Sequence, residues 1–244
     1  MVASCFALLA CFMLYAHPGS AFKRKLFSTT AGLTIHYYVF GISGLGSLAT
    51  NIVSYVIIKL APIHNQHVII FVVSGLALAL AQIHKQIFNF GVNGLDLPMN
   101  LMFNYCRVTA LACCIRDGQT VKDARKQGKE PNLKTREKVY AIEEIPSFFD
   151  FISYLYFCGA AISGPFYEFK DFQQMMAREG DFKDVPSTLK PGLMRFLNAW
   201  LCVVTGGIIS QFVDEKFMIT AEFLTGYSIP EKLIYQYLVV KLTM

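Results

Sequence analysis

Residues 68–83 read VIIFVVSGLALALAQI, and none of these positions carries a charged side chain. A helix needs about 20 predominantly apolar residues to cross the hydrocarbon core of a bilayer. The stretch comes close to that length by itself, so it predicts a membrane-spanning helix.

Similar apolar stretches recur along the rest of the chain. Of the 244 residues, 54% are hydrophobic and only 16% are charged, against about 25% charged in an average soluble domain. The charges gather at 22–26, 116–144 and 168–190, as expected when a charge inside the bilayer costs at least a few kcal/mol. The sequence therefore predicts an all-α, polytopic transmembrane helical bundle of six to eight spans, near residues 2–16, 31–61, 68–83, 97–115, 147–163, 192–213 and 231–244.

Two of these stretches admit more than one interpretation. Residues 2–16 could be a cleaved signal peptide, but basic residues follow the run instead of preceding it, which favours a retained anchor. Residues 31–61 form either one long tilted helix or two helices broken at the glycines Gly41, Gly44 and Gly46.

The segment 116–144 is predicted to be a cytosolic loop. It contains eight basic and six acidic residues, and an excess of Lys and Arg is typical of the cytosolic side of a membrane protein. A solvated loop is the favoured interpretation, and a lipid-headgroup site is the alternative.

The span 97–115 carries three strongly polar residues on one helical face. Asn100, Asn104 and Arg107 follow the spacing i, i+4, i+7. Such groups cannot face acyl chains without several kcal/mol of desolvation, so this face must look into the bundle or a watery cavity. They either line a site for a polar headgroup or acyl carrier, or bond neighbouring helices together.

The stretch 163–172, SGPFYEFKDF, follows an apolar run and starts with a Gly-Pro step that ends a helix. Aromatic residues then alternate with charged ones. This pattern is typical of a segment at the membrane interface, and it is called the elbow below.

Other classes of function find little support. Most aromatic residues sit inside apolar runs, which argues against nucleic-acid binding. The seven cysteines form no CxxC pair, so no zinc site or disulfide framework is expected. His64 and His67 have no further clustered ligand, and no metal site is predicted.

The elbow resembles the Gly-Pro-x-x-Glu-x-Lys-Asp-aromatic elbow of lysophospholipid acyltransferases in the membrane-bound O-acyltransferase family. Pro146-Ser147 and the aromatic run 154–157 precede it, as in that family, and Arg116-Asp117-Gly118 resembles the family's helix that ends in an Asp-Gly step. Further similarities at Phe27-Ser28-Thr29, Gly32 and Tyr55 spread the resemblance over most of the chain.

The resemblance implies an enzyme that moves an acyl chain from acyl-CoA to a lysophospholipid hydroxyl at the endoplasmic reticulum. It needs no cofactor beyond the co-substrate acyl-CoA, and its oligomeric state stays open. The candidate substrate-binding residues are Asn100, Asn104 and Arg107 of the polar stripe, together with Asp117, Gly164, Pro165, Tyr167 and Glu168 from the segments that carry the resemblance.

The chain departs from the family pattern at the catalytic residues. The family uses a His in a Trp-His-Gly motif and an upstream Asn, whereas the only Trp here, Trp200, is followed by Leu201. The chain is therefore expected to be the amino-terminal half of such an enzyme, truncated before the catalytic residues and inactive alone. The alternatives are a non-catalytic membrane protein, such as a scaffold, and a transporter whose polar stripe lines a pathway.

Overall fold

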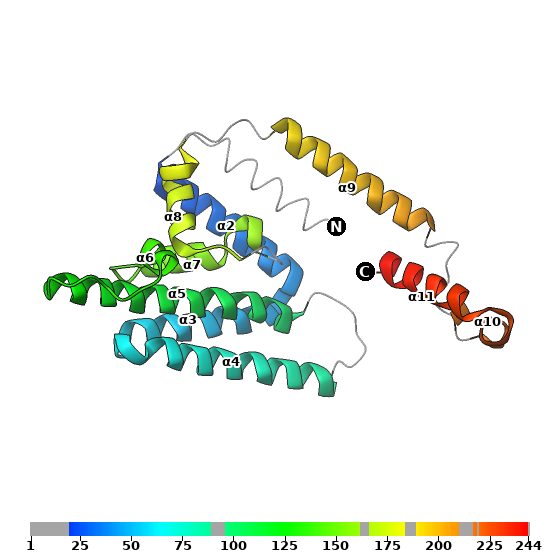
Figure 1. Ribbon diagram of the computed structural model, residues 1–244, viewed down its shortest axis with the longest axis horizontal. Coiled ribbons are helices and arrows are strands. Elements are labelled where there is room, and N and C mark those ends of the chain that lie inside the picture. The colour runs from blue at the N-terminus through cyan, green and yellow to red at the C-terminus, as the bar shows by residue number, and fades with distance from the viewer. Residues whose placement is uncertain are drawn as a thin grey trace. The chain divides into compact units, whose positions relative to one another are not determined.

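The computed structural model describes residues 20–88, 96–161, 166–183, 189–209, 217–218 and 220–243. All the regular secondary structure in these ranges is helical, which confirms the all-α class (Figure 1). The chain divides into two compact units, 1–183 and 184–244, and each is described by itself.

A break at Gly41 separates the first two helices of the first unit. Helix α2 (Ala21–Phe40) is followed by a single 3-10 turn, η1 (Gly41–Ser43), and by α3 (Gly44–Leu60). Gly41 has φ 54°, a left-handed conformation that glycine adopts without steric cost. Of the two interpretations of 31–61, two helices broken at the glycines is the correct one.

Helices α3, α4 (Ile63–Phe88) and α5 (Leu97–Lys126) lie side by side with alternating directions (Figure 1). Helices α4 and α5, with 26 and 30 residues, are longer than the predicted spans 68–83 and 97–115. Their facing sides bury a continuous apolar core whose fully enclosed members are Ile58, Ile70, Val108, Leu111 and Ala112. The outer faces of α3 and α4 remain apolar and exposed, as lipid contact requires.

Helix α5 does not end at Arg116-Asp117-Gly118. It continues to Lys126, so the first part of the predicted loop 116–144 is helical. The helix ends instead in a Schellman motif at Gly128, which has φ 65°, and there Lys129 N–H donates to the Ala124 carbonyl at 3.0 Å. Gly118 lies inside the helix because the returning chain passes so close that a Cβ would stand 1.9 Å from the Ile142 carbonyl oxygen.

Short elements follow α5: α6 (Thr135–Tyr140), α7 (Phe148–Leu155), η2 (Cys158–Ala160), α8 (Phe169–Ala177) and η3 (Gly180–Phe182). The prediction of a span at 147–163 is wrong for the part described. Helix α7 has eight residues and is about 12 Å long, too short to cross a bilayer. Its apolar side chains from Phe151 to Leu155 are buried in the protein core instead.

The second unit contains α9 (Leu189–Ile209), α10 (Ala221–Gly226) and α11 (Ile229–Thr243). With 21 residues, α9 is about 31 Å long, and it lies within the predicted span 192–213 for most of that range. A cluster of aromatic rings joins α10 to α11, with centroids 5.3–6.0 Å apart. The rings belong to Phe217, Phe223, Tyr227 and Tyr235.

Two helical stretches among the described residues are long and apolar enough to cross a membrane, Ala21–Leu60 and Ile63–Phe88. This supports a membrane protein, but it does not confirm six to eight spans. The predicted span 2–16 lies outside the described residues.

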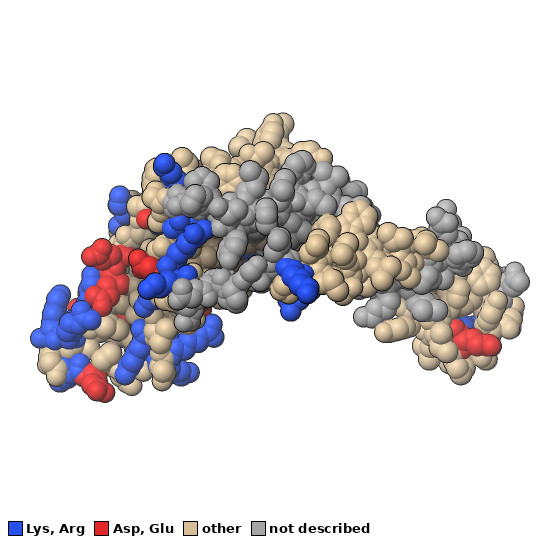
Figure 2. All heavy atoms as spheres, turned by 90° about the horizontal axis from the view of Figure 1, so that it is seen from above, with Lys and Arg blue, Asp and Glu red and all other residues tan. Residues whose placement is uncertain are grey.

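Charged side chains gather at one end of the first unit, where α5 ends and α6 lies (Figure 2). Lys and Arg predominate there, with Asp and Glu among them. At the opposite end of the first unit, the only charged side chains in its described helices are Lys85 and Asp96, which form an ion pair between α4 and α5. We call the first of these the charged end.

Candidate functional site

The polar stripe of α5 lies inside the bundle, as predicted. Asn100, Asn104 and Arg107 expose only 4%, 3% and 2% of their surface. None of the three side chains faces lipid, so the helical register inferred from their spacing is correct.

The two asparagines form a hydrogen-bond network with α3. Ser47 Oγ donates to Asn100 Oδ1 at 2.6 Å, and Asn104 Nδ2 donates to both Ser47 Oγ and Asn100 Oδ1 at 3.1 Å. One turn further along α3, Asn51 Nδ2 donates to the Tyr156 hydroxyl at 3.0 Å. The network joins α3, α5 and the chain after α7. The two asparagines thus bond neighbouring helices together, which is one of the two roles predicted for the stripe.

Ser47, Asn51 and Tyr156 were not among the residues predicted for the site. A signal for two of them was present, because Ser47, Asn51 and Ser54 repeat the i, i+4, i+7 spacing of the stripe on α5. The three are buried as well. Two polar faces of the same periodicity in neighbouring apolar helices are therefore the pattern that predicts this contact.

Arg107 connects α5 to the chain before the elbow and to the elbow itself. Its Nη1 donates to the Leu155 carbonyl at 3.1 Å and its Nη2 to the Ala160 carbonyl at 3.2 Å. These carbonyls belong to the last residues of α7 and η2, where backbone acceptors lack helical partners. The guanidinium also lies 4.9 Å from the centre of the Tyr167 ring, within the range of a cation–π interaction.

Tyrosine pairing and aromatic packing hold the elbow against α7. The Tyr154 hydroxyl donates to the Tyr167 carbonyl at 2.9 Å, and the Tyr167 hydroxyl donates to the Tyr154 carbonyl. Phe169 and Phe172 of α8 are buried on the same cluster. Gly164 and Pro165 lie outside the described residues.

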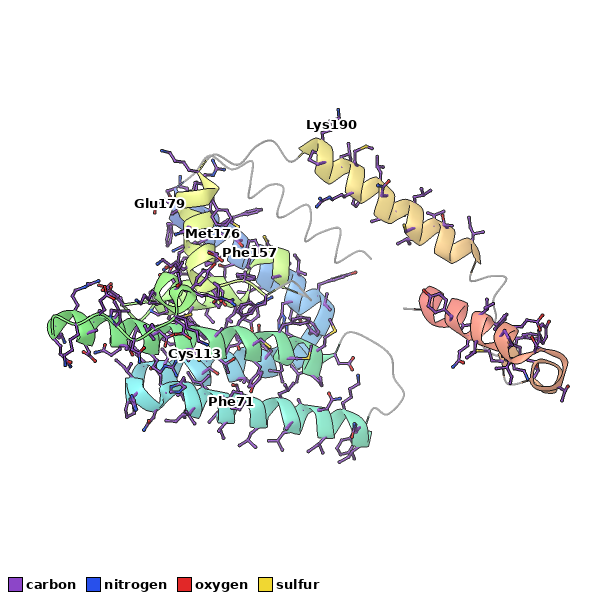
Figure 3. All side chains as sticks on the ribbon, viewed as in Figure 1. Phe71, Cys113, Phe157, Met176, Glu179 and Lys190 are labelled. Carbon is purple, nitrogen blue, oxygen red and sulfur yellow. The ribbon has the colours of Figure 1, made fainter. Side chains whose placement is uncertain are left out.

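Helix α8 closes this cluster against α2. Figure 3 shows Phe157 and Met176 in this part of the first unit; Met176 belongs to the apolar cluster, and Phe157 packs against it. Arg24 Nε donates to the Met176 carbonyl at 2.8 Å, near the end of α8, which fixes α8 to the start of α2. The aromatic residues of the elbow thus serve the protein core, while Phe166 alone among them is largely exposed.

Glu168 faces the charged end. Arg136 of α6 donates to Glu168 Oε1 at 3.0 Å, and Cys114 Sγ of α5 lies 3.9 Å from Glu168 Oε2. A second contact joins α6 to the elbow, where Tyr140 of α6 forms a hydrogen bond with Asp171. The negative charge of Asp171, together with partial burial and this hydrogen bond, raises the pKa of Tyr140. The elbow is thereby covered by α6 at the charged end.

Asp117 is separate from the stripe and the elbow. It accepts two hydrogen bonds from Arg116, at 2.8 and 3.1 Å, and the third arm of that guanidinium reaches His67 Nε2 at 3.3 Å. The cluster links α5 to the first turns of α4. Of the residues predicted for the site and described by the structure, Arg107, Tyr167 and Glu168 are brought to one place, with Asn100 and Asn104 one to two turns away on α5.

No catalytic dyad emerges from this arrangement within the part of the chain that the structure describes. His36 is buried between Phe40 and Tyr156, with Nε2 3.3 Å from the Gly44 carbonyl oxygen. Among the described residues, no three His, Cys, Asp or Glu side chains gather as metal ligands. Chemically, the site is a buried polar framework that fixes the orientation of the elbow.

Comparison with known proteins supplies the functional context. No family model matches the chain. Membrane-bound glycerophospholipid O-acyltransferase 2 of Rattus norvegicus is 27% identical over 256 residues, covering 97% of this chain and 48% of the relative. The Homo sapiens protein of the same name is 29% identical over 177 residues, covering 70% and 33% of the two chains.

A relative with a different name is lysophospholipid acyltransferase 6 of Drosophila melanogaster, 25% identical over 160 residues, which cover 66% of this chain and 21% of the relative. The chain spans about half the length, or less, of the curated relatives that it matches. These relatives confirm the resemblance first seen in the elbow: the chain is similar to proteins named as membrane-bound glycerophospholipid O-acyltransferases and lysophospholipid acyltransferases.

Proposed function

We propose that this chain forms part of a lysophospholipid acyltransferase that transfers an acyl group from acyl-CoA to a lysophospholipid hydroxyl in the endoplasmic reticulum membrane. The observation that carries the proposal is the similarity of 97% of the chain to a membrane-bound acyltransferase. A scaffold or transporter is not favoured, since the curated relatives reported above are named as acyltransferases.

Within that function, the described residues divide between framework and substrate contact. The hydrogen bonds of Asn100, Asn104 and Arg107 are directed to other parts of the chain, which supports a framework role. Tyr167 and Glu168, with Gly164 and Pro165 before them, form the elbow that the framework orients. We assign the acyl acceptor to the neighbourhood of the elbow, while Asp117 belongs to the charged end.

The expected chemistry requires a general base, which the family resemblance places in a motif that this sequence does not contain. A His in a Trp-His-Gly motif would remove the proton from the acceptor hydroxyl, and the motif does not occur in these 244 residues. The chain alone is therefore proposed to be inactive, and its contribution is to bind and orient.

A chimera tests the proposal. The stretch of the rat relative that matches this chain is replaced by the chain itself, and microsomes containing the chimera are given labelled acyl-CoA and a panel of lysophospholipids. Formation of labelled phospholipid at a rate well above that of microsomes without the chimera supports the proposal. A chimera that reaches the membrane, folds, and shows no transfer to any acceptor contradicts it and favours the scaffold alternative.

A further inference from the structure

A shallow cavity of about 540 Å³ lies between α4 and α5. Its lining is mostly apolar and includes two small residues of α4, Gly75 and Ala79, one helical turn apart. At Gly75 a Cβ would be in ordinary van der Waals contact with the Tyr105 ring, at 3.5 Å. We call this cavity the α4–α5 groove, lined by Gly75, Leu78, Ala79, Gln82, Met99 and Met102.

The Lys85–Asp96 ion pair closes one end of the groove. Both side chains are partly exposed, Lys85 by 33% and Asp96 by 24%. Within the described helices of the first unit, no other charged side chain lies at this end. The groove therefore presents one positive and one negative group beside a long apolar surface.

The depth of these features matches one leaflet of a bilayer. From Ile63 at the charged end to Lys85, α4 rises about 33 Å at 1.5 Å per residue, close to the ~30 Å hydrocarbon thickness. With α4 spanning a bilayer from the charged end, the ion pair would lie at the level of the lipid headgroups of the leaflet farther from the charged end. From Lys85 back to Gly75 the rise is about 15 Å, the depth of one leaflet.

From this geometry we infer that the α4–α5 groove binds a zwitterionic glycerophospholipid of the bilayer, with one acyl chain in the groove and its headgroup on the Lys85–Asp96 pair. The headgroup phosphate meets Lys85 and its ammonium group meets Asp96, so each charge of the lipid finds its opposite. Unbranched methionines adapt to a flexible chain. This site does not depend on the proposed acyltransferase activity and lies at the opposite end of the bundle from α6.

Photolabelling of the full chain tests the inference. The protein is reconstituted in phosphatidylcholine vesicles with a trace of phosphatidylcholine that carries a diazirine in one acyl chain. After irradiation, labelled peptides are quantified by mass spectrometry. We expect label on peptides containing 75–82 and 99–102, and weaker label there from a phosphatidylglycerol probe with the same chain, because that headgroup lacks the ammonium.

Variants separate a specific site from lipid that merely surrounds the helices. Ala79→Phe fills part of the groove, so that about two methylene groups of the lipid chain can no longer be buried there. Labelling should fall about tenfold, the effect of losing two buried methylene groups. Leu80→Phe, on the exposed lipid-facing side of α4, is the matched control and should change nothing. Lys85→Met should lower labelling, and the exchange Lys85→Asp with Asp96→Lys should restore it.

Equal labelling of A79F, L80F and the unchanged protein would overturn the inference. So would cross-links between two copies of α4, since Gly75 and Ala79 also suit close helix packing, and such cross-links would show a second copy in the groove. Size-exclusion profiles verify that each variant is folded before labelling is compared.

Discussion

The guanidinium of Arg107 stacks on the ring of Tyr167, 4.9 Å from its centre, and donates to the carbonyls of Leu155 and Ala160. One side chain of α5 thereby holds the end of α7, the end of η2 and the elbow. A charge in the middle of an apolar helix is costly unless its donors are satisfied, and here the protein backbone satisfies them.

Replacing Arg107 should therefore destabilise the fold. Arg107→Met leaves two buried carbonyls without their donor, at about 1–3 kcal/mol each, and should lower the thermal midpoint of the detergent-purified protein. Arg107→Lys should restore only part of the loss, because an ammonium cannot bridge both carbonyls and stack on the ring. Lys138→Met, an exposed change in α6, is the control, and an R107M midpoint equal to that of K138M would contradict the role.

Gly118 should be sensitive to the addition of a single methyl group. In Gly118→Ala the new Cβ meets the Ile142 carbonyl oxygen, so the segment after α6 must move away from α5. Overpacking costs about 1–3 kcal/mol, and trypsin should cut at the lysines and arginines of 125–138 at least about fivefold faster. Gln119→Ala is the neighbouring control, and identical digestion of both variants would show that the chain accommodates the methyl group.

Part of this architecture could be predicted from sequence and part could not, for definable reasons. The 3.6-residue period places Asn100, Asn104 and Arg107 on one face and requires that face to be buried. It does not name their partners, because a contact with Ser47 or Leu155 depends on which helices are neighbours. Periodicity in one element carries no information about that.

Hydropathy misled the prediction at 147–163. An apolar stretch predicts burial, but it does not distinguish burial in lipid from burial in protein, and Phe151 and Tyr154 are fully enclosed by other side chains. The Asp117-Gly118 step led to a different error, in the predicted end of the helix that begins at residue 97. A glycine after a polar residue resembles a helix end, whereas this glycine allows the close approach of Ile142.

Gln66 offers a test of what a buried polar group costs in this bundle. The side chain is fully buried, and neither its amide nitrogen nor its amide oxygen has a hydrogen-bond partner among the described residues. An unpaired buried amide costs about 1–3 kcal/mol by mutational measures, so Gln66→Leu should raise the thermal midpoint. Asn65→Leu, at an exposed position, should not, and a lower midpoint for Q66L would indicate that water satisfies the amide.

The charged end is expected to face the cytosol. Lys and Arg outnumber Asp and Glu in 116–144, and this segment lies at that end of the first unit (Figure 2). An epitope tag inserted near Lys126 should be digested by protease added to sealed microsomes. A tag that stays protected until detergent is added would show that the charged end faces the lumen instead.

The 244-residue chain alone is expected to show no acyltransferase activity. A lysophospholipid hydroxyl attacks a thioester slowly unless a base removes its proton in the transition state, and a positioned base contributes about 10²–10⁴-fold. The family resemblance places that base in a Trp-His-Gly motif, and here Leu201 follows the only Trp. The elbow can bind a substrate while the stripe orients the elbow, but binding that is equal in ground and transition states does not raise turnover. Purified chain in detergent, supplied with labelled acyl-CoA and lysophospholipid, should form no labelled phospholipid, whereas a full-length relative assayed in parallel should.

Robust turnover by the chain alone would refute the argument and direct attention to His36 or His84 as the base. The variants His36→Gln and His84→Gln would then identify which of the two removes the proton.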